Sequence, residues 1–282
     1  MKKVAIITDS TAYIPDELLK KYSIQVAPQV LIWGNETFLD GVDILPNEFY
    51  TRLASAKVMP STSQVTPNYF KKQFQSLVEQ DYDILAILIG NNLSGTIASA
   101  IQAKEDFPDS SIEIVDSNTT AMALGFMVLT SARAAIDGAN LVDCKHIAET
   151  SANHVGVVFA VDTLEFLHRG GRIGGAQRLL GTALKMKPIL EVTGGRVEGI
   201  ERVRTRSKSL NRLVELVEER INGRSPVHLA TLHANSYEDA HMILDTSSEK
   251  FNAIESIFSE VSPVIGTHAG PGTVGLAFLA GI

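Results

Sequence analysis

The sequence contains a single cysteine, Cys144, among its 282 residues. One thiol cannot form a disulfide within the chain or build a structural zinc site by itself, so nothing indicates an oxidising compartment. Long apolar runs are also missing. No stretch approaches the roughly 18–20 apolar residues that cross a bilayer, and the run Val4–Ile7 is too short for a signal peptide. We therefore expect a cytoplasmic protein without a transmembrane segment.

Basic residues are fewer than acidic ones: the chain has 25 Lys and Arg and 32 Asp and Glu, which gives a net charge of −7. A surplus of negative charge disfavours phosphate backbones, so nucleic acid is not an expected partner. Hydrophobic residues make up 45% of the chain, which is enough for two ordinary cores at this length. Two domains are therefore the expectation.

Two patterns divide the chain. The first half alternates short, two-sided apolar runs with helical patterns, which is typical of buried parallel strands joined by crossover helices. Its expected strands are Val4–Thr8, Asp83–Ile89 and Ile112–Val115. From about residue 155 paired strands predominate, and Pro188–Thr193 and Arg196–Arg206 predict a hairpin around Gly194-Gly195. We expect an α/β fold, with a doubly wound parallel-sheet domain over residues 1–155 and an α+β domain with a largely antiparallel sheet over residues 156–282.

Apolar residues at helical spacing predict an amphipathic helix in each half. The first stripe is Phe70, Phe74, Leu77 and Val78. The second stripe is Leu210, Leu213, Val214, Val217 and Ile221. Both helices should pack against a sheet.

Small polar residues follow each expected strand of the first half, in the segments Thr8–Thr11, Gly90–Thr96 and Asp116–Thr120. Ligands of open α/β sheets bind outside the carboxyl ends of the strands, so these segments outline a crevice. Within it, Ser94 and Gly95 precede a helix that should begin near Ile97, where unpaired N–H groups and hydroxyls favour an anion. Simple capping of that helix is an equal alternative.

Two further segments place polar side chains in irregular backbone. Thr62 and Ser63 lie in a loop bracketed by prolines, and His268 lies among three glycines and a proline. Such a histidine can donate to a carboxylate or act as a base, although a surface histidine in a turn fits the spacing equally well. No pair of histidines shows metal-ligand spacing, so no metal is predicted.

Basic residues gather in two places. Arg169 and Arg172 lie in a glycine-rich turn that lacks both nucleotide-binding glycine patterns, so nucleotide binding is not expected. The second group, spaced by two residues as on one face of a strand, is Arg202, Arg204 and Arg206. Such a stripe is either a solvated face or a docking surface for an anionic partner.

Ser94, His268 and an aspartate, Asp9 or Asp116, are the components of a Ser-His-Asp hydrolase. The Gly-x-Ser-x-Gly elbow is missing, however, so nothing in the sequence constrains these residues to meet. An enzyme that acts on a small carboxylate or ester through Ser94 and His268 is kept as an alternative.

Together these segments resemble the DegV family, in order, from residue 4 to the carboxyl end. The matching motifs are Thr8-Asp9-Ser10-Thr11, Thr62-Ser63-Gln64, Leu93-Ser94-Gly95-Thr96, Val115-Asp116-Ser117, Val161–Leu167 with Arg169–Gly174, Lys187–Leu190 and His268–Gly272. No single motif is decisive, but their agreement extends over nearly the whole chain. There are departures, since many relatives carry serines in place of Gly90-Asn91 and a proline in place of Val65. The first departure alters the rim of the expected polar pocket.

The resemblance implies that a long-chain fatty acid lies in a tunnel between the two domains. It assigns the hydrogen bonds of the carboxylate to Thr62, Ser94 and His268, and helix N–H groups including that of Gly95 complete the cradle. It further implies a protein that is not an enzyme and needs no cofactor. Such a protein presents the acid to a separate, ATP-binding fatty acid kinase subunit, which makes the acyl-phosphate. A lipid sensor or storage protein without a kinase fits the sequence equally.

In this picture the basic residues dock the kinase or hold the new phosphate, and replacing Arg172 by alanine should spare fatty acid binding but lower kinase-dependent turnover. Transient contact with a membrane is compatible with such a carrier. Candidates for the tunnel wall are Phe126, Met127, Phe166, Leu180 and Met186, although each alone is more typical of plain core. A monomer is the default expectation.

Overall fold

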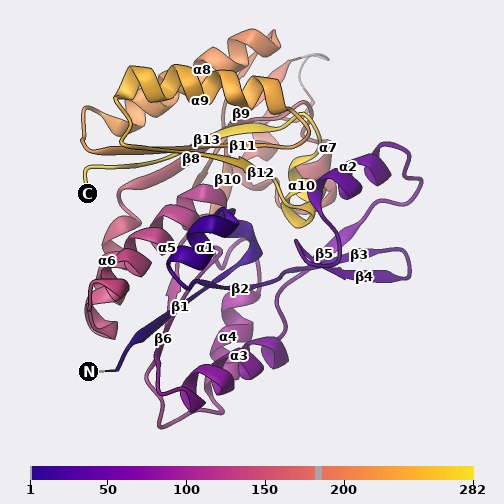
Figure 1. Ribbon diagram of the computed structural model, residues 1–282. Helices are drawn as coiled ribbons and strands as arrows, with labels where there is room; N and C mark the ends of the chain where they lie inside the picture. The colour runs from indigo at the N-terminus through magenta and orange to yellow at the C-terminus, as the bar shows by residue number, and fades with distance from the viewer. Residues whose placement is uncertain (1, 182–185) are drawn as a thin grey trace.

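The computed structural model describes residues 2–181 and 186–282, and three sheets organise it (Figure 1). The first is a parallel sheet of order β2-β1-β6-β7, formed by Val4–Asp9 (β1), Gln25–Ala27 (β2), Asp83–Leu88 (β6) and Ile112–Asp116 (β7). The second is antiparallel, of order β4-β3-β5, and contains Val30–Trp33 (β3), Glu36–Leu39 (β4) and Ser61–Ser63 (β5). The three strands expected in the first half are confirmed, with ends that differ by one residue.

The third sheet belongs to the second half and has the order β10-β9-β8-β13-β11-β12. Its strands are Val155–Ala160 (β8), Lys187–Thr193 (β9), Arg196–Val203 (β10), Val227–His233 (β11), Glu255–Glu260 (β12) and Val274–Ala280 (β13). Only β11 and β12 run parallel, so the largely antiparallel sheet is confirmed. Gly194 and Gly195 make the turn between β9 and β10 with φ angles of 56° and 71°, as the hairpin required.

Helices separate and cover these sheets. In the first half they are Ser10–Ala12 (η1), Asp16–Lys21 (α1), Pro46–Ala54 (α2), Pro67–Glu79 (α3), Thr96–Lys104 (α4), Ala121–Ile136 (α5) and Leu141–Ser151 (α6). In the second half they are Glu165–Arg169 (α7), Gly174–Leu179 (η2), Arg206–Ile221 (α8), Tyr237–Phe251 (α9) and Pro263–Ala269 (α10). None of the helices in residues 2–181 and 186–282 combines the length and apolar character needed to cross a bilayer.

The layers follow from where the apolar side chains lie. Figure 1 shows α8 and α9 over the outer face of the six-stranded sheet, α5 beneath its inner face, and α3 and α4 beyond the parallel sheet. Both predicted helical stripes are confirmed: the residues of the second are buried, as are Phe70, Phe74 and Leu77 of the first. Helix α5 is apolar on nearly every side, which suits a helix held between two sheets.

One hydrophobic core joins the two halves, since Ile6 of β1, Phe126 of α5 and Leu279 of β13 belong to the same cluster. The predicted domain boundary at residues 155–156 falls at the beginning of β8, four residues after the end of α6. Whether residues 1–155 fold independently stays a prediction.

Three local expectations were wrong. Thr62 lies in the short strand β5, opposite Leu31 of β3, and not in a loop. His268 lies in the last turn of α10 and not in irregular backbone. The arginine stripe does not exist as one strand face, because β10 ends at Val203 and Arg206 begins α8, whose N-cap is Thr205.

Asp40 ties α10 to the first half of the chain. Its side chain is buried, and one carboxylate oxygen accepts a hydrogen bond from the Val264 backbone N–H at 3.1 Å while the other accepts from the Ser10 hydroxyl at 2.7 Å. Because the first N–H groups of a helix have no partner within it, a carboxylate at this point fixes the start of α10. Burial raises the pKa of Asp40 from 3.8 to about 6.

This raised pKa predicts how Asp40 contributes to stability. The folded protein holds a proton on Asp40 up to about pH 6, whereas the unfolded chain releases it near pH 3.8. The contribution of Asp40 to the free energy of unfolding is therefore fully present below about pH 4, and it is lost as the pH rises through 6. Chemical denaturation should show that the free energy of unfolding of the parent falls, relative to the Asp40→Asn variant, by up to about 3 kcal/mol across this range. A constant difference would contradict the assignment.

Candidate functional site

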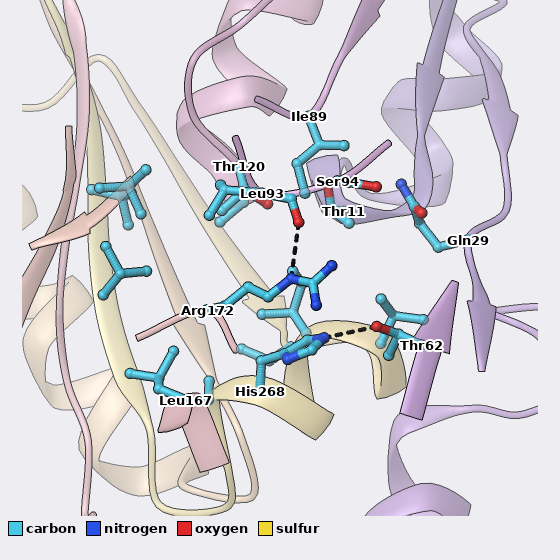
Figure 2. Close-up of a pocket in the computed structure, with 18 of the residues that line it drawn as sticks. Thr11, Gln29, Thr62, Ile89, Leu93, Ser94, Thr120, Leu167, Arg172 and His268 are labelled. Atoms are coloured by element: carbon cyan, nitrogen blue, oxygen red, sulfur yellow. Dashed lines mark hydrogen bonds between the residues drawn. The ribbon is translucent and has the colours of Figure 1, made fainter. Parts of the chain in front are cut away.

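A pocket lies where the carboxyl ends of the parallel strands face the six-stranded sheet (Figure 2). The empty space within it, with the open mouth included, is about 930 Å³. The four residues predicted to hold a carboxylate, Thr62, Ser94, Gly95 and His268, all line it. They come from β5, the loop before α4 and α10, segments far apart in the sequence.

Most of the remaining wall is apolar. Its apolar part is formed by Ile89, Leu93, Ala121, Val157, Phe159, Leu167, Val192, Val197, Leu232, Val261, Val264, Ile265 and Ala269. None of the five bulky candidates is among the lining residues that the structure describes. Phe126 and Met127 are instead fully buried core, and Phe166 lines a second cavity beside the first.

His268 and Thr62 lie side by side in the pocket wall, with the imidazole pointing toward the Thr62 hydroxyl (Figure 2). Nε2 of His268 lies 2.8 Å from the Thr62 hydroxyl oxygen. Burial, helped by the nearby positive charge of Arg172, lowers the pKa of His268 to about 4, so the imidazole is neutral at pH 7 and carries one N–H. Its Nδ1 is buried without a hydrogen-bond partner among the described residues and lies against Gly170.

Ser94 lies just before α4. Its hydroxyl oxygen is 2.9 Å from that of Thr96 and accepts the Thr96 backbone N–H at 3.3 Å. The helix begins at Thr96, one residue before the expected start, with Gly95 as its N-cap residue. Ser94 therefore satisfies one helix N–H, as the capping alternative required, and also lines the pocket.

Arg172 lies in the pocket wall and also in the wall of the second cavity. Its guanidinium donates to the carbonyl oxygens of Leu93 at 3.1 Å and Gly170 at 2.9 Å, and Figure 2 shows it extending between His268 and Leu93. Arg172 therefore shares the pocket of the predicted carboxylate site, whereas the sequence suggested only contact with a partner or with a phosphate.

The second cavity adjoins the polar end of the pocket. Its lining residues are Leu53, Met59, Pro60, Ser61, Thr62, Phe166, Arg169, Gly170, Arg172, Thr267 and His268. Arg169 is half-exposed there and pairs with Glu165. Arg202, Arg204 and Arg206 line neither space, and the Arg206 guanidinium donates to Asp239 and to the Gly272 carbonyl, each at 2.7 Å.

The components of the hydrolase alternative form hydrogen bonds elsewhere. His268 bonds to Thr62, whereas Asp9 accepts hydrogen bonds from Thr11 and Ile89, and Asp116 accepts from the backbone of Asn91 and Asn118. Across the part of the chain that the structure describes, no three His, Cys, Asp or Glu side chains gather to hold a metal ion.

Sequence patterns missed Gln29, a polar residue of the wall. Gln29, which is 2% exposed, follows β2 and places its side-chain amide 2.9 Å from the Thr96 hydroxyl oxygen. No motif includes Gln29, so only its spatial neighbours reveal it. Gly90 and Asn91, whose identity departs from the family pattern, are not among the described lining residues.

The close approach of Gly170 to His268 gives a testable prediction. A Cβ at Gly170 would lie 2.0 Å from Nδ1 of His268, so Gly170→Ala should displace the imidazole and break its contact with Thr62. A displaced ring regains solvent, and its pKa should rise from about 4 toward 6.5 in an NMR titration. Gly171→Ala is the control for backbone strain alone, because its φ of 70° disfavours a side chain but nothing lies within 4 Å of a Cβ there. An unchanged His268 pKa in Gly170→Ala would show that the ring is not held by this contact.

Comparison with known proteins gives a consistent answer. A model described as "Uncharacterised protein, DegV family" matches residues 3–281. DegV domain-containing proteins of Clostridium perfringens and Streptomyces coelicolor are 34% and 35% identical to this chain, each over 98% of both chains.

Solved structures agree with these matches. A fatty-acid-binding DegV family protein from Thermus thermophilus has a TM-score of 0.93 and 30% identity over 99% of both chains. DegV from Bacillus subtilis, a fatty acid binding protein, has a TM-score of 0.90 and 31% identity over 99% of this chain and 100% of its own. Sequence motifs, fold and pocket therefore lead to one conclusion: this chain belongs to the DegV family.

Proposed function

We propose that the protein binds one long-chain fatty acid and presents it to a separate fatty acid kinase subunit. One observation carries this proposal: the four residues predicted to hold a carboxylate line the same pocket as a largely apolar wall. The solved relatives from Thermus thermophilus and Bacillus subtilis, described as fatty-acid-binding proteins, support it.

The carboxylate lies between Thr62 and Ser94 in this proposal. If the single N–H of neutral His268 is on Nε2, it donates to Thr62, which leaves the Thr62 hydroxyl proton for the ligand. Ser94 supplies a second hydroxyl, and the N-terminus of α4 at Gly95 contributes its positive end. The Arg172 guanidinium adds a full positive charge beside these donors.

The hydrocarbon tail supplies most of the gross affinity. Burial of each CH₂ contributes about 0.8 kcal/mol, so a tail of about sixteen to eighteen carbons provides on the order of 10 kcal/mol before the cost of association. Valine, leucine and isoleucine side chains of the six-stranded sheet and of α10 form the wall for it.

The second cavity supports presentation to a kinase over simple storage. It meets the pocket at Thr62, Arg172 and His268, and it offers Arg169 as a further cation where a phosphate on the carboxylate would emerge. Arg202 and Arg204 are proposed docking contacts outside it. We assign Arg206 to structure instead, because Asp239 and Gly272 hold its guanidinium.

Identification of the bound lipid tests the proposal directly. Purified protein is denatured and extracted with organic solvent, and mass spectrometry should find a stoichiometric long-chain fatty acid. Ser94→Ala should lower the affinity for added fatty acid by roughly tenfold or more, the cost of one hydrogen bond to a charged group. Ser76→Ala on the exposed face of α3 is the control. An empty protein that also fails to bind added fatty acid would remove the proposal.

The two arginines should separate binding from turnover. Arg172→Ala should weaken fatty acid binding, because its charge lies in the pocket wall, and this revises the expectation from the sequence. Arg169→Ala should leave the affinity unchanged and lower the rate of acyl-phosphate formation with the kinase subunit, since Arg169 lines only the second cavity. Equal turnover by Arg169→Ala and the parent would eliminate Arg169 from the kinase step.

A further inference from the structure

The hydroxyl of Ser94 has only one proton, and a bond to an anion requires that this proton point at the ligand. Two groups near Ser94 decide where it points. The backbone N–H of Thr96 donates to the Ser94 oxygen at 3.3 Å, and the Thr96 hydroxyl oxygen lies 2.9 Å away. If Thr96 donates its own hydroxyl proton to Ser94, the Ser94 proton is left for the ligand.

Gln29 determines which way the Thr96 hydroxyl donates. Thr96 is fully buried, and its hydroxyl oxygen lies 2.9 Å from Nε2 and 3.1 Å from Oε1 of Gln29. Donation from Nε2, the nearer atom, leaves the Thr96 proton free for Ser94. Donation from Thr96 to Oε1 would instead remove that proton from Ser94.

Asp9 favours the first of these arrangements. It is fully buried, and its oxygens accept from the Ile89 N–H at 2.7 Å, the Thr11 hydroxyl at 2.6 Å and the Thr11 N–H at 3.1 Å. Burial raises the pKa of Asp9, and the side chain of Gln29 is among the neighbours that lower it. An amide NH₂ group that faces a carboxyl group favours its charged form, and the second N–H of that NH₂ group is then available to Thr96.

The backbone of Gln29 is fixed as well. Its N–H donates to the Ser10 hydroxyl oxygen at 3.1 Å, and Ser10 in turn donates to Asp40 at 2.7 Å. The amide therefore starts from a held position, and Figure 2 shows Gln29 beside Ser94 on the same side of the pocket.

We propose that Gln29 and Thr96 are positioning residues that aim the hydroxyl proton of Ser94 at the ligand. This inference rests on the proposed function, since it concerns the same carboxylate. Its consequence is selectivity: a hydroxyl held as a donor gains most from an ionised head group, because hydrogen bonds to charged acceptors are about twice as strong as neutral ones.

The test compares a C16 fatty acid with the C16 alcohol, both measured by competition against a fluorescent fatty acid. Thr96→Val keeps the shape of the side chain and removes its hydroxyl, and it should weaken binding of the acid roughly tenfold while changing that of the alcohol much less. Thr96→Ser should restore the preference of the parent. Gln29→Met, which acts on the same relay, should reproduce the loss and decides the matter if Thr96→Val does not fold.

Three outcomes would overturn the inference. The first is an equal loss of affinity for acid and alcohol, which would indicate a merely structural contribution. The others are no loss of affinity for either ligand, and no rescue by Thr96→Ser. The parent is measured first. If the parent does not bind the acid, the proposed function itself fails. If the parent binds it and the variants keep its preference for acid over alcohol, only the relay fails.

Discussion

The proposed ligand joins a carboxylate to a hydrocarbon chain, and burying both side by side is the constraint on which the rest of this site depends. An ionised group that leaves water must regain its hydrogen bonds, whereas the attached tail requires a wall with few polar groups. Both demands are met where two kinds of sheet face each other. The ends of the parallel strands supply hydroxyls and the N-terminus of α4, and the six-stranded sheet supplies side chains such as Val157, Phe159 and Val192.

The polar end is held from outside the pocket, so little freedom remains within it. Asp40 fixes the start of α10, which carries His268, and Gly170 allows the imidazole to lie against the backbone of the turn after α7. Gln29 and Thr96 hold Ser94 from the opposite side. Donors that are already oriented need not be ordered when the ligand arrives, and this saves part of the free energy that binding would otherwise cost.

Sequence patterns predicted the features that depend on neighbours along the chain. Buried strands, apolar helix stripes and the glycine turn of β9 and β10 are all local signals. The strand β5 has only three residues, too few to show alternation. The glycines around His268 were read as loop, but a Cβ at Gly266 would lie 2.6 Å from the Tyr50 hydroxyl, so this glycine serves the close packing of α10 against α2. Gln29 gave no signal because its partner Thr96 is 67 residues away.

The location of the pocket also couples ligand binding to the contact between the two halves. Leu93 and Ala121 of the first half and Leu232 and Val197 of the second all line it, and the core cluster around α5 contains residues of the same two halves. A tail that fills this space contacts both walls at once and extends the hydrophobic core. A ligand that binds only the folded state stabilises that state by mass action. The proposed fatty acid therefore acts as cargo and as part of the packing that holds the two halves together.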